Sequence, residues 1–155
     1  LFDLSGRQFE LLLFDLFRTM PDYEDPVVRS MTHDGGYEMD VRFRDPVTNT
    51  WDRILIQAKH ENKPVPVSHT RELLGTLSIE SSRRSRSKRL RGLMISLFPP
   101  SLSSEAAADE SPFSIDFLSA DDLVDLMIRN RVGCKSENIP KSVVDTTFWD
   151  EIMGE

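Results

Sequence analysis

The segments 38–43 and 53–59 restrict the fold of this chain more than any other part of its sequence. The first alternates polar with apolar residues, and the second is an apolar run that ends in Gln-Ala-Lys, so both have the pattern of β-strands. Residues 45–50 between them contain Asp, Pro and Asn, which are typical of turns. The sequence therefore predicts a hairpin of two neighbouring strands.

The remaining segments predict a larger sheet covered by helices. A capping box of Ser5 and Gln8 precedes apolar residues at helical spacing, so we expect a first helix that ends at Pro21. Further patterns predict a short strand at 27–28, a helix over 68–80, a strand over 92–98, a loop or short helix over 101–110, a strand over 113–118 and a helix over 121–130. This order indicates an α/β fold, a mixed central β-sheet flanked by helices, in a single domain over residues 1–155.

Composition excludes several classes of protein. The chain has 155 residues, of which 39% are apolar, which suits one core and is too little for two large ones. No run of apolar residues approaches the roughly 18 that a membrane span takes. Cys134 is the only cysteine and the three histidines are scattered, so neither an internal disulfide nor a zinc site is expected.

Asp40, Gln57 and Lys59 are the candidate catalytic residues of the hairpin. Alternate residues of a strand point to the same face, so Gln57 and Lys59 lie together, and paired strands would bring Asp40 to them at one end of a sheet. An acid, an amide and a lysine around a divalent cation suit phosphodiester hydrolysis, because the cation stabilises charge on the phosphate and helps to deprotonate water. The alternative is that Glu38, Asp40 and Arg42 form the wet face of an ordinary amphipathic strand.

Six short motifs follow one another along the chain. They are Phe-Glu at 9–10, Asp-Gly-Gly at 34–36 followed by an Asp, Gln-Ala-Lys at 57–59, RELLG at 71–75, GLMIS at 92–96 and LVDLMIRNRVG at 123–133. In order and approximate spacing they resemble the catalytic domain of Mrr-type restriction endonucleases, from about Leu4 to the terminal FWDEI. That group has the PD-(D/E)xK nuclease fold, so the resemblance implies a restriction-endonuclease-like mixed sheet flanked by helices.

The resemblance also assigns roles to individual residues. Asp40 matches the metal-binding acid, Gln57 the position where most of the superfamily has Glu or Asp, and Lys59 the active-site lysine. Glu10 matches the helix glutamate, although by itself it would be read as a surface residue. Gln at the first position of the triplet is similar to what Mrr-like members themselves carry.

The implied cofactor is Mg²⁺ or Mn²⁺. Because Gln57 removes one negative charge, metal binding would depend more on Asp40, Glu10, the backbone carbonyl of Ala58 and substrate phosphate oxygens, as Mg²⁺ chemistry permits. These residues, with Gln57 itself as a neutral oxygen donor, form the expected ligand set.

The identity of the acid has more than one candidate. The Asp-Gly-Gly turn at 34–36 leaves Asp40 farther downstream than the compact form of the motif does. Whether Glu38 or Asp34 shares the metal role therefore stays open.

Basic residues gather in one segment. The net charge is -7, yet residues 83–91 hold six of the nineteen cations and no acid; these are Arg83, Arg84, Arg86, Lys88, Arg89 and Arg91. Cations that neutralise phosphates release counterions and add salt-sensitive affinity, so the segment is a candidate for binding DNA. A serine-rich basic loop that serves solubility, phosphorylation or targeting is the alternative.

Together these expectations describe a metal-dependent endonuclease, a Mg²⁺-dependent deoxyribonuclease that hydrolyses DNA phosphodiester bonds. Its expected partner is DNA and not a membrane, and cleavage of both strands needs two active centres, which a homodimer would supply. The competing hypothesis is a catalytically weak or inactive nuclease-fold module that binds nucleic acid or a partner protein, motivated by the missing second acid. A weaker resemblance to a fungal mitochondrial group leaves the location open between mitochondrial and generally intracellular.

Overall fold

The computed structural model describes residues 1–28, 38–83, 89–136 and 142–154. In chain order its elements are α1 (Gly6–Thr19), β1 (Tyr23–Val28), β2 (Met39–Arg44), β3 (Trp51–Lys59), α2 (Val67–Ser82), β4 (Arg89–Ser96), α3 (Leu102–Asp109), β5 (Ile115–Leu118), α4 (Ala120–Asn130), β6 (Cys134–Ser136), β7 (Ser142–Val144) and α5 (Thr146–Met153). None of the helices in these ranges is both long and apolar enough to cross a membrane.

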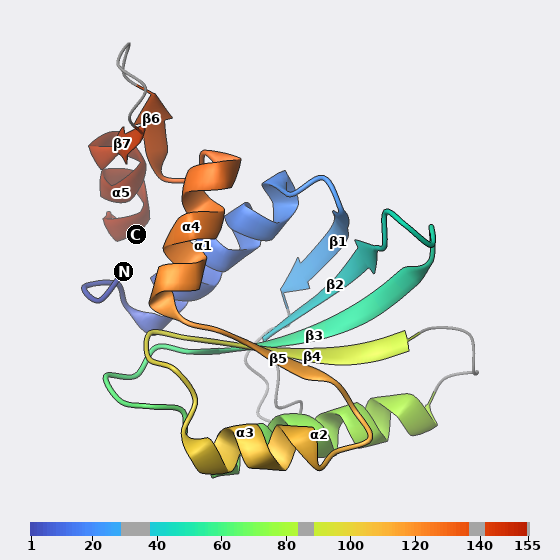
Figure 1. Ribbon diagram of the computed structural model, residues 1–155. Helices are drawn as coiled ribbons and strands as arrows, with labels where there is room; N and C mark the ends of the chain where they lie inside the picture. The colour runs from blue at the N-terminus through green and yellow to red at the C-terminus, as the bar shows by residue number, and fades with distance from the viewer. Residues whose placement is uncertain (29–37, 84–88, 137–141, 155) are drawn as a thin grey trace.

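Strands β1 to β5 form one sheet in that spatial order. The pairs β1–β2 and β2–β3 are antiparallel, whereas β3–β4 and β4–β5 are parallel. Figure 1 shows α1 and α4 over one face of the sheet, and α2 and α3 over the other. The predicted α/β fold, a mixed sheet flanked by helices, is therefore confirmed.

Two capping boxes fix where helices begin. At α1 the N–H of Ser5 donates to Gln8 Oε1 at 2.7 Å, and the N–H of Gln8 donates to Ser5 Oγ at 3.3 Å. Ser119 and Asp122 form the equivalent pair at α4. These bonds give partners to backbone N–H groups that the first turn of a helix leaves unpaired.

The sheet separates two apolar clusters. Alternate residues of β3 serve opposite faces, because Ile54 and Ile56 pack on the α1 side and Leu55 packs on the α2 side. A strand covered on both faces is apolar at successive positions, which explains the uninterrupted run seen in the sequence. The cluster under α2 consists of Leu55, Val65, Leu73, Leu77 and Met94.

Gly92 in β4 allows α2 to lie close to the sheet. A Cβ at this position would stand 3.0 Å from Ile115 and 3.1 Å from both Leu73 and Leu77. Such distances are shorter than ordinary packing contacts, which are near 4 Å. A residue without a side chain therefore suits this point of β4.

Two parts of the chain differ from the sequence-based expectation. β1 covers Tyr23–Val28 rather than 27–28 alone, and an irregularity in its pairing with β2 obscures the alternation that would have revealed it. The segment 101–110, expected as a loop or short helix, contains the short helix α3. The terminal β6, β7 and α5 were not predicted, because strands of three residues and a helix of eight carry little periodic signal.

Candidate active site

The register of the β2–β3 hairpin decides which acid meets Gln57. Asp40 pairs with Leu55. The N–H of Glu38 donates to the carbonyl of Ile56 at 2.9 Å, so the pairing continues beyond the start of β2. Glu38 consequently lies opposite Gln57, and Asp40 lies two residues farther along β2, on the same face.

Glu38 lies beside Lys59 at the carboxyl end of β3. Its Oε2 accepts a hydrogen bond of 2.7 Å from the N–H of Ala58, and its Oε1 is 4.0 Å from Lys59 Nζ. Burial raises the pKa of Glu38, and although the Ala58 N–H and the Lys59 charge oppose this, the pKa stays above its ordinary value, with a further contribution from the charge of Glu10. The site thus joins a half-buried carboxylate to an ammonium group.

Gln57 carries an amide oxygen that lacks a partner. The side chain is 1% exposed, and its Nε2 donates to Glu72 Oε2 on α2 at 3.3 Å. Its Oε1 is buried and has no hydrogen-bond partner among the residues that the structure describes. Buried polar atoms are nearly always paired, so this acceptor is available to a ligand.

Asp40 is engaged by Arg53, a β3 residue that is only 4% exposed. Arg53 Nε donates to both carboxylate oxygens of Asp40 at 3.0 Å, and its Nη2 donates to Oδ2 at 2.5 Å. On its other side, Arg53 Nη1 donates to Glu80 Oε2 of α2 at 2.7 Å. Lys59 forms an ion pair with Glu38, and the role of Asp40 as a metal ligand stays a prediction.

Glu10 lies next to this site from the α1 side. It lines a small cavity together with Glu38 and Ala58. Its Oε2 accepts a hydrogen bond of 3.0 Å from Arg7 Nη1 on the same helix. The structure thus places Glu10 beside Glu38 and Ala58. The predicted role of Glu10 at a metal site stays a prediction.

The basic segment is described only in part. Arg84, Arg86 and Lys88 lie outside the described residues, as does Asp34 of the Asp-Gly-Gly turn. Arg89 is exposed at the start of β4.

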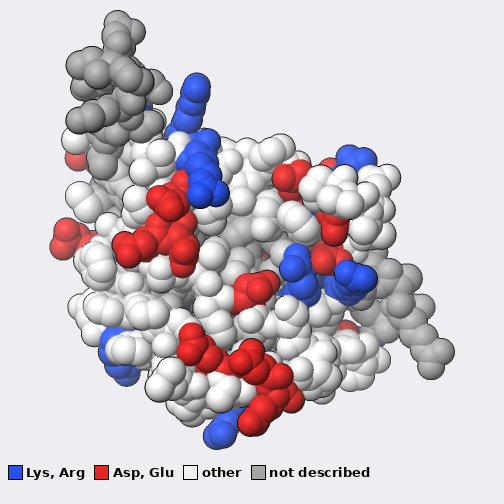
Figure 2. Space-filling model, in the orientation of Figure 1, with Lys and Arg blue, Asp and Glu red and all other residues white. Residues whose placement is uncertain are grey.

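The other two basic residues of the segment pair with acids. Arg83 pairs with Glu80 at 3.1 Å, and Arg91 pairs with Asp52 at 3.1 Å. On the face of the molecule that Figure 2 shows, both acidic and basic side chains lie among the described residues. The predicted DNA-binding role of the segment stays a prediction.

The donor atoms at the site suit a hard cation. No group of three or more His, Cys, Asp and Glu side chains is placed to hold a metal within the described ranges. Glu38 offers a carboxylate and Gln57 an unpartnered amide oxygen, with Glu10 nearby. Mg²⁺ is commonly held by one or two carboxylates, several waters and substrate phosphate oxygens, so a sparse set of oxygen donors fits it.

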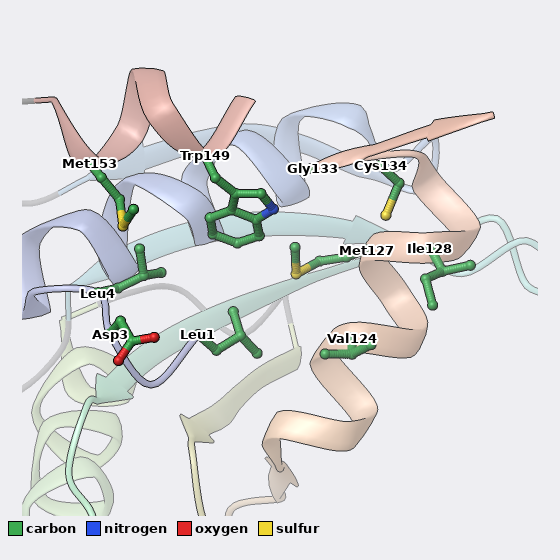
Figure 3. A pocket seen from close by; sticks show the side chains of 10 residues that line it. All are labelled: Leu1, Asp3, Leu4, Val124, Met127, Ile128, Gly133, Cys134, Trp149 and Met153. Atoms are coloured by element: carbon green, nitrogen blue, oxygen red, sulfur yellow. The ribbon is translucent and has the colours of Figure 1, made fainter. Parts of the chain in front are cut away.

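A larger pocket lies elsewhere, between the N-terminal residues, α4 and the terminal elements (Figure 3). Its volume is about 350 Å³. Its walls are mainly apolar and consist of Leu1, Asp3, Leu4, Val124, Met127, Ile128, Gly133, Cys134, Trp149 and Met153. None of the predicted site residues lines it, so it does not bear on the chemistry of the hairpin.

Sequence reasoning missed the α2 partners of the site. Glu72 and Glu80 lie in the predicted helix over 68–80 and Arg53 begins the predicted strand over 53–59, but none of the three was assigned a role. One signal was available: Arg53 shares a strand face with Leu55 and Gln57, and a cation on a buried face requires acids from the element that covers it.

Comparisons with known proteins agree with this fold. A family model described as restriction endonuclease, Mrr_cat, matches residues 1–127. No curated protein matches the chain. A solved structure of MspJI restriction endonuclease in complex with a 27-mer oligonucleotide is similar, with a TM-score of 0.65 and 16% identity, over 99% of this chain and 33% of that one. At this identity the likeness shows the fold, and the chain spans about a third of the length of that protein.

Proposed function

Because the chain belongs to the Mrr_cat restriction endonuclease family, we propose that it is a nuclease that hydrolyses DNA phosphodiester bonds with a divalent cation, Mg²⁺ or Mn²⁺. The observation that carries the proposal is the buried, unpartnered Oε1 of Gln57, which lies opposite Glu38 and two residues before Lys59. An acceptor, an anion and a cation are thus carried by neighbouring positions at the carboxyl end of β3. The family accounts for why these groups would stand together.

In this proposal Glu38 and Gln57 hold the cation, and Glu10 supports it from α1. Glu38 takes the position that the sequence had suggested for Asp40, because the register places Glu38 opposite Gln57. A divalent cation bound there would stabilise negative charge on the phosphate and lower the pKa of a bound water. Asp40 acts by holding Arg53, which fixes β2 against β3.

Lys59 is the proposed electrostatic partner of the scissile phosphate. Its Nζ stands 4.0 Å from the Glu38 carboxylate, and its side chain remains partly exposed. An ammonium group in a preorganised position stabilises charge that develops on phosphate oxygens in the transition state. Glu38 keeps the ammonium at the metal side of the site.

DNA is the proposed substrate. The MspJI structure is a complex with an oligonucleotide, and the basic segment 83–91 offers cations for phosphates. A cut through both strands takes two active centres, so we expect two copies of the chain to act together on a duplex.

Nicking of supercoiled plasmid tests the proposal. The purified chain is incubated with Mg²⁺ or Mn²⁺, beside Lys59→Met and Glu38→Gln variants. Either substitution is expected to lower the cleavage rate by about a hundredfold or more, as loss of a preorganised charge typically does. Lys63→Met is the matched control, because Lys63 is an exposed lysine four residues away that pairs with Glu61. Cleavage that survives Lys59→Met would show that a different site, or a contaminant, cuts the DNA.

One observation favours a second function, binding of nucleic acid without cutting. Within the described ranges the site has few anions, and Gln57 stands where most of the superfamily has an acid. This alternative predicts DNA binding that is unchanged by chelators and by Glu38→Gln. Metal-stimulated nicking that requires Lys59 would exclude it.

A further inference from the structure

We propose that Glu72 of α2 is a positioning residue that fixes the amide of Gln57 with Oε1 turned toward the cation site; this rests on the proposed function. Glu72 Oε2 accepts the hydrogen bond from Gln57 Nε2 at 3.3 Å. The contact joins the middle of the second helix to the strand that carries the triplet. It is the contact that distinguishes the two ends of the Gln57 amide.

An amide must be oriented before it can serve as a metal ligand. Its oxygen binds cations, whereas its NH₂ group only donates hydrogen bonds, and rotation of the terminal torsion exchanges the two. The Gln57 side chain is 1% exposed, so water does not settle the choice. A carboxylate that accepts from Nε2 leaves Oε1 on the opposite side, where the structure has it unpartnered.

Glu72 has a neighbour on its own helix. His69, one turn earlier on α2, lies with its Nδ1 3.6 Å from Glu72 Oε2. The Nε2 of the same ring is 3.2 Å from Glu61 Oε1 in the connection that follows β3. The imidazole thus lies between two carboxylates, beside a Glu72 side chain that is 50% exposed.

This contact explains why a glutamine suits position 57. A carboxylate there would lie within hydrogen-bonding distance of the Glu72 carboxylate, and two anions at such a distance repel one another. An amide turns the same contact into a charge-assisted hydrogen bond. Gln57 and Glu72 are therefore matched to one another, and the lost anionic ligand is offset by a fixed neutral one.

The experiment compares Glu72→Leu with Glu72→Gln, each in the natural Gln57 background and in a Gln57→Glu background. Gln at position 72 keeps an acceptor and loses the charge, whereas Leu loses both. Mn²⁺ affinity is measured by electron paramagnetic resonance without DNA, and plasmid nicking is measured separately. Circular dichroism checks that each variant is folded. Half of the Glu72 side chain is exposed, so its replacement leaves the core intact.

In the Gln57 background, Glu72→Leu is expected to weaken Mn²⁺ binding about tenfold, the size expected for a hydrogen bond to a charged group, while Glu72→Gln stays within about twofold of the natural chain. In the Gln57→Glu background the Leu and Gln variants are expected to bind alike, because both carboxylate oxygens are acceptors. Without metal, the Nε2 protons of Gln57 should shift upfield in Glu72→Leu alone, as seen by nuclear magnetic resonance.

Three results would overturn the positioning role. The first is an equal loss of Mn²⁺ affinity in Glu72→Leu and Glu72→Gln, which would indicate simple charge attraction. The second is the same difference in Mn²⁺ affinity between these two variants in both the Gln57 and the Gln57→Glu backgrounds. The third is an unchanged Gln57 amide signal in Glu72→Leu. A chain that shows the expected gap in Mn²⁺ binding but never nicks DNA would refute the nuclease proposal and leave the role of Glu72 standing. A chain that nicks DNA but shows no difference in Mn²⁺ affinity between Glu72→Leu and Glu72→Gln would refute the role of Glu72 and leave the nuclease proposal standing.

Discussion

At the scale of single residues, Glu38 and Asp40 share one face of the hairpin but contact different partners. They are two positions apart in the hairpin, so strand alternation gives them the same face. Their partners nevertheless differ, because Glu38 contacts the Ala58 N–H and Lys59, whereas Asp40 receives three hydrogen bonds from Arg53. In the proposed function Glu38 binds the metal, whereas Asp40 pairs with Arg53.

This division predicts opposite outcomes for two conservative substitutions. Glu38→Gln should lower the rate of metal-dependent nicking about a hundredfold or more. It should change the free energy of unfolding little, because an amide oxygen can still accept the hydrogen bond from the Ala58 N–H. Asp40→Asn should lower the free energy of unfolding by about 2 kcal/mol, because it weakens the pairing of a buried Arg53 that keeps only Glu80 as a full anion. Urea denaturation and plasmid nicking are measured for both variants. Loss of nicking in Asp40→Asn together with loss of stability in Glu38→Gln would return the metal role to Asp40.

At the scale of elements, α2 is tied to the sheet by charge and by close packing. Arg53 joins β3 to Glu80, and Gly92 lets Leu73 and Leu77 approach β4. The same helix supplies Glu72 to the site, so its placement controls the orientation of Gln57. A shift of α2 would therefore alter the chemistry as well as the stability.

The Glu80 pair predicts how stability depends on pH. Burial would raise the pKa of Glu80, but the hydrogen bonds and charge of Arg53, with a smaller contribution from Arg83, outweigh it and hold the pKa below its ordinary value of 4.5. A carboxyl group with a lowered pKa in the folded state stabilises fully above that value and loses its contribution as the pH falls through the lowered pKa. Glu80→Gln should thus flatten the fall in unfolding free energy below pH 4.5. Glu105→Gln, at an exposed position of α3, serves as the control, and equal slopes for natural chain and Glu80→Gln would refute the pairing.

Two glycines provide a matched test of the packing of α2. Gly92→Val should lower the free energy of unfolding by about 2 kcal/mol, because side chains of α2 and Ile115 already stand near 3 Å from the position of its Cβ. Gly75 lies in α2 itself, with open space around it. Gly75→Ala should therefore raise the free energy of unfolding by about 0.5–1 kcal/mol through helix propensity. Chemical denaturation of both measures the difference, and a neutral Gly92→Val would mean that α2 is free to move away.

At the scale of the whole molecule, the sequence was sufficient for the fold class and for most elements of the sheet. Capping boxes and strand alternation located α1, β2 and β3, since these signals are local. It did not locate β6, β7 and α5, which are too short to show a period, nor the α2 partners Glu72 and Glu80, whose roles depend on where the helix docks. Strand patterns gave the face of Glu38 and Asp40 correctly, but the hairpin register was needed to choose between them.

The most direct test is the location of Mn²⁺ by anomalous diffraction from crystals of the natural chain grown with the metal. The account predicts a peak that contacts the Glu38 carboxylate and Gln57 Oε1, with Arg53 still bonded to Asp40. A peak on Asp40 with Arg53 displaced, or metal bound only away from Gln57, would contradict it.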